Sequence, residues 1–180
     1  MLGVSGNIAE TAAAKVSTAT PLQLLRVNAA GTALEWFTPP ACRVYGSIGV
    51  TVPTATDTAI AFNTERYDVG SIHSTVTNTS RLTAPIAGVY HVEGNIRITS
   101  AAAATVLLSI RLNGTTVIAQ TAWKTATGID NGMIVSCDYA LAASDYVEIV
   151  VRHNEGSDLS TGGNANWADE ASMRWTGPST

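Results

Sequence analysis

The stretch GVYHVEGNIRIT, residues 88–99, decides the fold class of this chain. It is a β-branched and aromatic run bounded by turn residues, which is the pattern typical of a strand. No helical period interrupts the sequence from Ala41 onward, so we predict that residues 41–180 are all-β. Further runs of the same kind are RVYGSIGVTV (43–52), TAIAF (58–62), TVLLSIRL (105–112), TTVIAQ (115–120), MIVSCDYAL (133–141) and DYVEIVV (145–151).

Tight turns separate these runs. Leu112-Asn113-Gly114-Thr115 carries Asn-Gly, the strongest short-range hairpin signal, between two of the runs. Ala142-Ala143-Ser144-Asp145 predicts another tight reversal. Strands spaced by roughly 8–12 residues indicate a β-sandwich or a jelly roll.

The central residues also resemble a known family. Residues 59–98, AIAFNTERYDVGSIHSTVTNTSRLTAPIAGVYHVEGNIRI, are similar to the C1q/TNF-like jelly-roll family in Phe62-Asn63, in Tyr67-Asp68 and in the turn that leads into the long core strand. The resemblance extends over about residues 43–176, although ASMRWTG departs from the family's usual last strand. The positions that align with the family's turn are Pro85, Gly88, Val89 and Tyr90.

This resemblance implies a ten-stranded jelly roll of two packed sheets that assembles as a homotrimer. Some relatives bind calcium through two aspartates, and Asp130 falls at the place of one of them. The other place, near Ala122-Trp123, has no carboxylate. We therefore expect no metal site and no cofactor.

The N-terminal residues have a different pattern. NIAETAAAKVS, residues 7–17, predicts a short capped helix, and PLQLLRVNAAGTALEWF, residues 21–37, predicts a β-hairpin that turns at Asn28–Gly31. Pro39-Pro40 then forms a stiff joint, so we divide the chain into a stalk, residues 1–40, and a knob, residues 41–180. A lone hairpin is marginally stable in water. The stalk side chains that need a partner are Ile8, Val16, Leu22, Leu24, Leu34, Trp36 and Phe37.

The composition fits self-association. Charged residues make up only 13% of the 180 residues and hydrophobic residues 46%, with a mean hydropathy of +0.17. One interpretation is a monomer with a large core and a bland surface. The other is that several copies bury one another's apolar faces, which we favour because the hairpin needs the same solution.

Several classes of function are disfavoured. The net charge of −4 and the scattered ten Lys and Arg argue against nucleic acid. No apolar run reaches the roughly 18 residues of a membrane span, and the first ten residues do not resemble a secretory signal. Cys42 and Cys137 match no metal-ligand spacing, and their pairing stays open.

Catalytic chemistry is also poorly represented. HExxH, GxSxG and phosphate-binding loops are absent from the sequence. His73, His91 and His153 lie in different segments, and HNEGSD (153–158) is interpreted as a solvated loop. A polysaccharide hydrolase would need a carboxylate pair, and no recognisable pair is present. The sequence therefore predicts a non-enzymatic protein.

The hairpin carries a second resemblance. LLRVNAAGTALEW, residues 24–36, is similar to a short motif that recurs in bacteriophage tail-fibre and other virion appendage proteins. This resemblance implies a trimeric virion protein, made in the host cytoplasm and exposed on the particle. Residues 1–40 would contact other virion proteins, and the knob would attach to a host surface glycan or protein.

An alternative is a capsid-decorating or head-fibre trimer that stabilises the particle and has no specific ligand. For the attachment hypothesis, the contact residues are expected in polar, loop-like stretches of the knob. The candidates are Trp123, Asp130, Asn131, Trp167 and Asp169.

Overall fold

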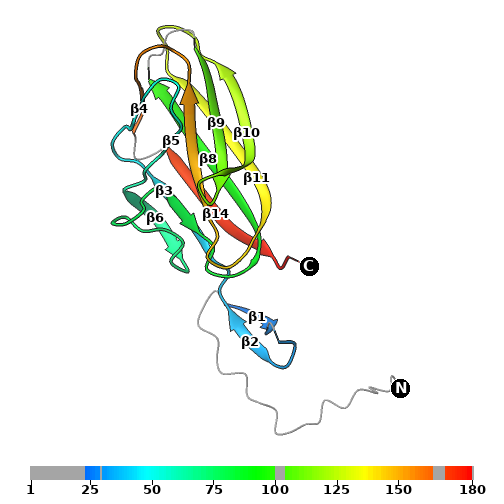
Figure 1. Cartoon of the computed structure of the whole chain (residues 1–180). Helices are drawn as coiled ribbons and strands as arrows, with labels where there is room; N and C mark the ends of the chain where they lie inside the picture. Colours follow the sequence, from blue (N-terminus) through cyan, green and yellow to red (C-terminus); the bar gives the residue numbers. More distant parts are fainter. Residues whose placement is uncertain (1–22, 29, 100–103, 164–168, 180) are drawn as a thin grey trace, which may run out of the picture. The chain divides into compact units, whose positions relative to one another are not determined.

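The strand predicted from residues 88–99 lies at the centre of the larger of the two sheets of the knob in the computed structural model (Figure 1). The structure describes residues 23–28, 30–99, 104–163 and 169–179. The larger sheet has seven strands: β3 (Ala41–Tyr45), β4 (Thr51–Val52), β6 (Thr64–Val69), β8 (Gly88–Thr99), β11 (Asn131–Leu141), β13 (Leu159–Thr161) and β14 (Glu170–Gly177).

The pairing within this sheet joins distant parts of the sequence. β8 has β11 on one side and β14 on the other, both antiparallel. β14 then pairs with β3, and β3 with β6, while β13 joins the end of β8 to β4. The first and last strands of the knob are therefore neighbours.

The smaller sheet covers one face of the larger sheet. β12 pairs with β9, with β5 and with β7, and β9 also pairs with β10. Its five strands are β5 (Thr58–Ala59), β7 (Arg81–Thr83), β9 (Thr105–Leu112), β10 (Thr116–Lys124) and β12 (Tyr146–His153).

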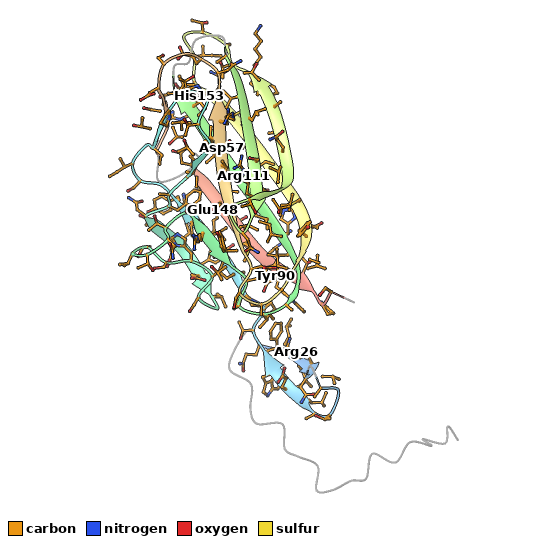
Figure 2. The ribbon with its side chains drawn as sticks, in the orientation of Figure 1. Arg26, Asp57, Tyr90, Arg111, Glu148 and His153 are labelled. Carbon is orange, nitrogen blue, oxygen red and sulfur yellow. The ribbon has the colours of Figure 1, made fainter. Side chains whose placement is uncertain are left out.

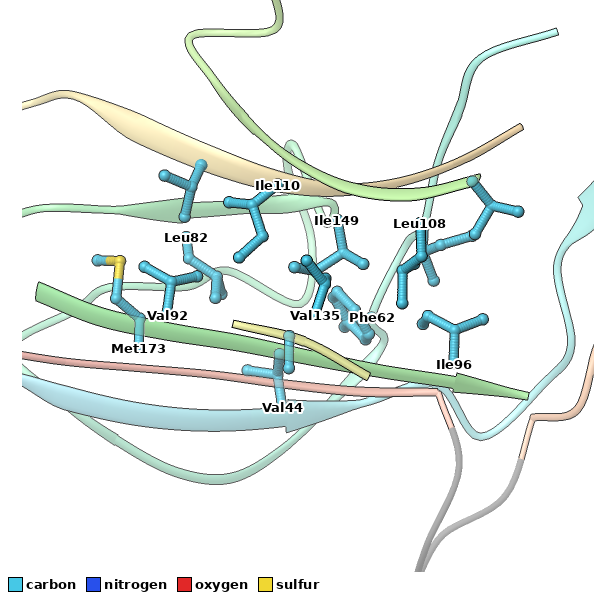
Figure 3. Packing of buried hydrophobic residues seen from close by; sticks show 14 of the residues in the cluster. Val44, Phe62, Leu82, Val92, Ile96, Leu108, Ile110, Val135, Ile149 and Met173 are labelled. Atoms are coloured by element: carbon cyan, nitrogen blue, oxygen red, sulfur yellow. The ribbon is translucent and has the colours of Figure 1, made fainter. Parts of the chain in front are cut away.

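The core lies between the two sheets (Figure 3). Alternate residues of β8 face inward, so Tyr90, Val92 and Ile96 are fully buried, while Glu93 between them is exposed. Gly94 allows the sheets to approach closely, because a Cβ atom there would lie 2.7 Å from Ile149 Cδ1. This two-layer arrangement confirms the predicted all-β jelly roll.

The predicted turns have the expected backbone geometry. Asn113 has φ 50° and Gly114 has φ 76°, the left-handed pair that an Asn-Gly hairpin turn requires. In the second turn the amide of Asp145 donates to the carbonyl of Ala142 over 3.1 Å, and Ser144 has φ 73°. Both turns connect strands as the sequence predicts.

The number of strands differs from the prediction. The two sheets contain twelve strands in the described residues, not ten, because short strands are added at the ends of longer ones. The run RVYGSIGVTV divides into β3 and β4, and the amide of Val50 between them donates to Thr161 Oγ1 over 2.8 Å. Residues 43–52 thus pair first with β14, through β3, and then with β13, through β4.

Ion pairs attach the loops and edges to this framework (Figure 2). Asp57, between β4 and β5, lies 2.8 Å from Arg111 Nη2 on β9 and 3.6 Å from Arg152 Nη1 on β12. Buried Glu170 binds both Arg43 and Arg66, so one carboxylate links β14 to β3 and β6.

The predicted hairpin forms as a separate unit. The chain divides into compact units 1–38 and 39–180, and in the first unit β1 (Leu24–Val27) pairs with β2 (Leu34–Phe37). Gly31 has φ 73°, and its amide donates to the carbonyl of Asn28 over 2.9 Å. The predicted helix at 7–17, with Ile8 and Val16, and also Leu22, lie outside the described residues.

Two further points from the sequence are resolved. Cys42 and Cys137 are both free thiols, and Cys42 is buried among core side chains. Burial raises the pKa of the Cys42 thiol to about 12. The described part of the chain contains no helix long and apolar enough to cross a membrane.

Candidate functional site

The structure separates the predicted receptor-contact residues into exposed and buried groups. Trp123, near the end of β10, is 56% exposed. Asp130 is also exposed, just before β11, and its carboxylate lies 2.8 Å from Arg97 Nη1 on β8. These two remain candidates for surface contacts, whereas Trp167 lies outside the described residues.

Asn131 and Asp169 are buried, which corrects their expected position on an exposed loop. Asn131 Oδ1 accepts from the amide of Ala126 over 3.0 Å, and its Nδ2 donates to the carbonyl of Ile129 over 2.9 Å. Asp169 accepts from the amide of Gly163 over 2.7 Å. Both side chains form hydrogen bonds with backbone groups of nearby loops, because buried backbone groups need partners.

A surface that the sequence analysis missed lies where β10 and β11 run beside each other (Figure 1). Each is an edge strand, since β10 pairs only with β9 and β11 only with β8 in the described residues. We call this surface the β10–β11 edge. Its exposed apolar side chains are Val117, Trp123, Ile134 and Tyr139.

Ile134 is the most exposed of this set, at 61%. Met133 and Val135 beside it point into the core, so strand alternation places Ile134 on the outer face of the sheet. Its registered neighbour on β8 is Asn95, and the next row carries Glu93 and Ser136. An exposed isoleucine on an otherwise polar face indicates a contact surface. In GMIVSCDY, residues 132–139, apolar side chains alternate with small or polar ones except at Ile134, and this exception was the available signal.

The hairpin has two different faces. Leu25 is paired with Trp36 and Val27 with Leu34, so these four side chains share one apolar face. On the other face Arg26 binds Glu35 over 2.8 Å and stacks on Phe37, which is paired with Leu24.

The two faces of the hairpin separate the stalk residues that were predicted to need a partner. Leu25, Val27 and Leu34 are each about half exposed or more. The predicted residues Leu34 and Trp36 lie on the apolar face, and Leu24 and Phe37 lie on the face with the ion pair. Contact of this apolar face with other molecules stays a prediction.

The histidines have structural partners. His91 Nδ1 on β8 lies 2.9 Å from Asp138 on β11, and buried His153 Nε2 lies 2.7 Å from the carbonyl of Val52. In the described residues no group of three His, Cys, Asp or Glu side chains is arranged to hold a metal ion.

Comparisons with known proteins identify similar structures. Eiger TNF from S. frugiperda superposes with a TM-score of 0.58 at 15% identity, over 79% of this chain and 96% of that one. Murine APRIL gives a TM-score of 0.57 at 8% identity, over 77% of this chain and 100% of that one. The globular domain of zebrafish complement 1qA gives 0.50 at 13% identity, over 78% and 99%.

These similarities cover 77–79% of the chain and establish its fold. The knob has the C1q/TNF-like jelly-roll fold, as the resemblance of residues 59–98 implied. No protein-family model matches the chain, and no curated protein matches it. At these identities the comparisons concern the fold alone.

Proposed function

We propose that this chain is a non-enzymatic, homotrimeric virion protein of a bacteriophage, whose knob attaches the particle to a host surface. The observation that carries the self-association is the set of exposed apolar side chains on the two edge strands β10 and β11, of which Ile134 is the most exposed. A trimer with closed symmetry would cover this edge in every copy.

The energetics favour such a contact. Full burial of one Ile or Leu side chain contributes about 1.5–3 kcal/mol relative to exposure. Each subunit offers Val117, Ile134 and Tyr139 on the knob, and Leu25, Val27 and Leu34 on the hairpin. In a trimer this burial occurs in all three copies. Charged residues, whose burial would cost free energy, make up only 13% of the chain.

Attachment follows from the multivalency of a trimer. Three weak sites on one trimer, and several trimers on one particle, raise avidity without any new contact. In this proposal the stalk, residues 1–40, contacts other virion proteins, and the knob is exposed on the particle. Of the predicted contact residues, exposed Asp130 lies outside the β10–β11 edge that the trimer would cover, and its carboxylate pairs with Arg97.

One observation favours the alternative of a capsid-decorating or head-fibre trimer. Asn131 and Asp169, two of the residues expected to contact a receptor, are buried and have structural partners. A knob that only stabilises the particle needs no ligand-contacting loop near Asn131 and Asp169.

The first experiment measures mass by light scattering. We expect three times 18.7 kDa for the purified chain. Ile134→Glu, which places a charge on the β10–β11 edge, should give monomers, whereas Ile48→Glu, at a loop position that is more exposed, should leave the trimer intact. A monomeric parent chain, or a trimer indifferent to Ile134→Glu, would refute the proposed interface.

A second experiment locates the protein. Electron microscopy of particles with the chain labelled should show label at a tail tip for the attachment function. Label spread over the capsid would support decoration instead, and absence of label from particles would refute both.

A further inference from the structure

A polar hollow of about 380 Å³ lies on the knob, beside the segment that connects β6 to β7. Its other wall consists of β7, the turn between β11 and β12, and the start of β12. The volume lies within the range of small-ligand pockets, about 300–1,000 Å³. The lining is rich in hydroxyl and amide groups, from Ser71, Ser74, Thr77, Asn78, Thr83 and Ser144.

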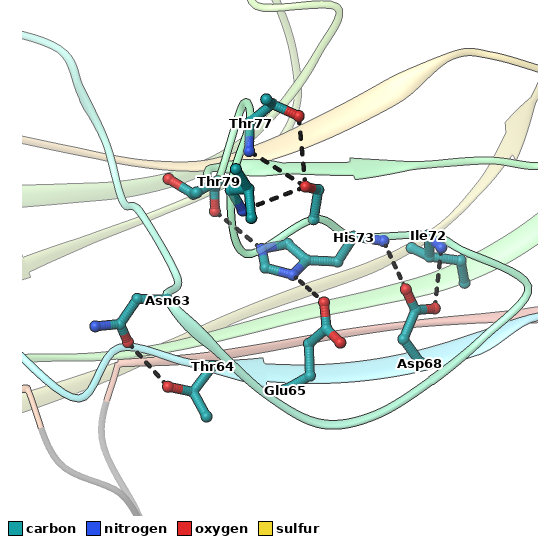
Figure 4. A network of polar contacts seen from close by, with 10 residues as sticks. Asn63, Thr64, Glu65, Asp68, Ile72, His73, Thr77 and Thr79 are labelled. Carbon is teal, nitrogen blue, oxygen red and sulfur yellow. Dashed lines mark hydrogen bonds and ion pairs between the residues drawn. The ribbon is translucent and has the colours of Figure 1, made fainter.

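The wall of this hollow is held by buried polar contacts (Figure 4). His73, buried in the segment between β6 and β7, has Nδ1 2.9 Å from Glu65 Oε1 and Nε2 3.1 Å from the carbonyl of Thr79. Asp68 accepts from the amides of Ile72 and His73, over 2.9 and 3.0 Å. The wall is therefore organised without a ligand, which reduces the ordering that binding requires.

Arg81 is the cationic group of the lining. Its guanidinium stacks on the Tyr146 ring, 4.1 Å from the centroid, and this contact fixes the orientation of the side chain. Its Nε lies 3.8 Å from Glu148 Oε1, which is beyond hydrogen-bond distance, and Ser80 Oγ donates to that same oxygen over 2.6 Å. Within the described part of the chain, the five guanidinium N–H groups of Arg81 therefore donate to no protein acceptor, and only the backbone amide of Arg81 donates, to the carbonyl of Asn78.

We propose that this hollow binds a sugar that carries a carboxylate, such as a uronic acid unit. A planar guanidinium with unused donors suits bidentate recognition of a carboxylate. The hydroxyl and amide groups of the lining supply donors and acceptors for sugar hydroxyls. Glu148 beside Arg81 leaves little net positive charge, which favours one carboxylate over a multiply charged anion.

The proposal rests on the proposed function in one respect, since the acidic sugar would belong to a host surface glycan. It differs from the sequence-based candidates, because the hollow contains neither Trp123 nor Asp130. The attachment point of the knob is then the hollow beside the β6–β7 segment rather than the loop that precedes β11.

The test uses the full chain labelled with ¹⁵N and titrated with glucuronate. We expect millimolar binding that shifts the amide signals of residues 71–78 and 144–146. Glucose and acetate, which each lack one half of the recognised group, should bind at least tenfold more weakly. Equal binding of acetate would reduce the site to a carboxylate site, and equal binding of glucose would remove the role of Arg81; either result overturns the proposal.

Variants test the role of Arg81 directly. Arg81→Gln should weaken glucuronate binding at least tenfold, and Arg81→Lys, which keeps the charge but loses the planar fork, should weaken it by less. Arg174→Gln, at an exposed position on β14, is the matched control and should bind normally. Unchanged binding by a folded Arg81→Gln chain overturns the proposal.

The mass of each variant is measured on the same samples. A trimer that does not bind glucuronate rejects the acidic-sugar site while leaving the trimeric knob in place. A monomer that binds glucuronate rejects the trimer while leaving the sugar site in place.

Discussion

Replacing Tyr90 by phenylalanine should destabilise the knob by about 1–2 kcal/mol. Tyr90 is fully buried on β8, and its hydroxyl donates to the carbonyl of Ile86 over 2.8 Å. That bond fixes the turn that leads the chain into its central strand. A net hydrogen bond contributes about 0.5–1.5 kcal/mol, and the Ile86 carbonyl left without its partner adds to the loss.

The assay is urea unfolding at one fixed protein concentration, because self-association would make stability depend on concentration. With an m-value of about 2 kcal/mol per molar urea, the midpoint should fall by about 0.5–1 M. Tyr90→Ala, which also removes the ring from the core, should lose about 3–5 kcal/mol.

Tyr139→Phe is the matched control, since Tyr139 lies on the neighbouring strand directly opposite Tyr90 but is exposed. Its stability should change by less than about 0.5 kcal/mol. If Tyr90→Phe and Tyr139→Phe have the same midpoint as the parent chain, the hydroxyl does not anchor the turn and our reasoning is wrong.

Three other perturbations give distinct results. Because the pKa of Cys42 is raised to about 12, its burial contributes stability that is complete below the ordinary thiol pKa of 9.0. That stability should be lost by up to about 1.4 kcal/mol per pH unit between pH 9 and 12, and unfolding of Cys42→Ala should lack this slope. The Arg111 guanidinium lowers the pKa of Asp57. The stability that this ion pair contributes is therefore complete above the ordinary pKa of 3.8 and is lost as the pH falls through the lowered pKa. An NMR titration should show the lowered pKa returning toward normal in Arg111→Gln, and no change would contradict the ion pair. Gly88→Ala would place a Cβ atom 2.1 Å from Trp175 Nε1, so the melting temperature should fall by an amount equivalent to about 1–3 kcal/mol or more. An unchanged melting temperature would show that the turn can move.

Local chemistry explains how much of the fold could be predicted. Asn113-Gly114 dictates its turn through left-handed backbone angles, and β-branched runs such as DYVEIVV mark buried strands irrespective of their partners. The central resemblance then implied that these strands form two packed sheets. β6, by contrast, contains Thr, Glu, Arg and Asp, and it is a strand because β3 offers a free edge for pairing.

The candidate site was less predictable, because exposure depends on tertiary contacts. Asn131 precedes a glycine and looks like an exposed turn residue, but its amide group is satisfied by the loop it closes. Asp169 is buried for the same reason. Arg81 and Tyr146, which line the polar hollow, are 65 residues apart in number, and only the pairing of β7 with β12 brings them together.

The pairing of β3 with β14 has a consequence for how the protein is made. Val44 is registered with Ala171, so the first strand of the knob acquires this neighbour only after the residues up to 171 have been synthesised. Until then β3 and β8 each lack one neighbour and present apolar edges that can aggregate. Such long-range pairing also makes folding slow, on the order of milliseconds to seconds, which stopped-flow refolding would measure. A nascent chain that ends before Glu170 should therefore require a chaperone, and synthesis of β14 commits the knob to its final sheet order.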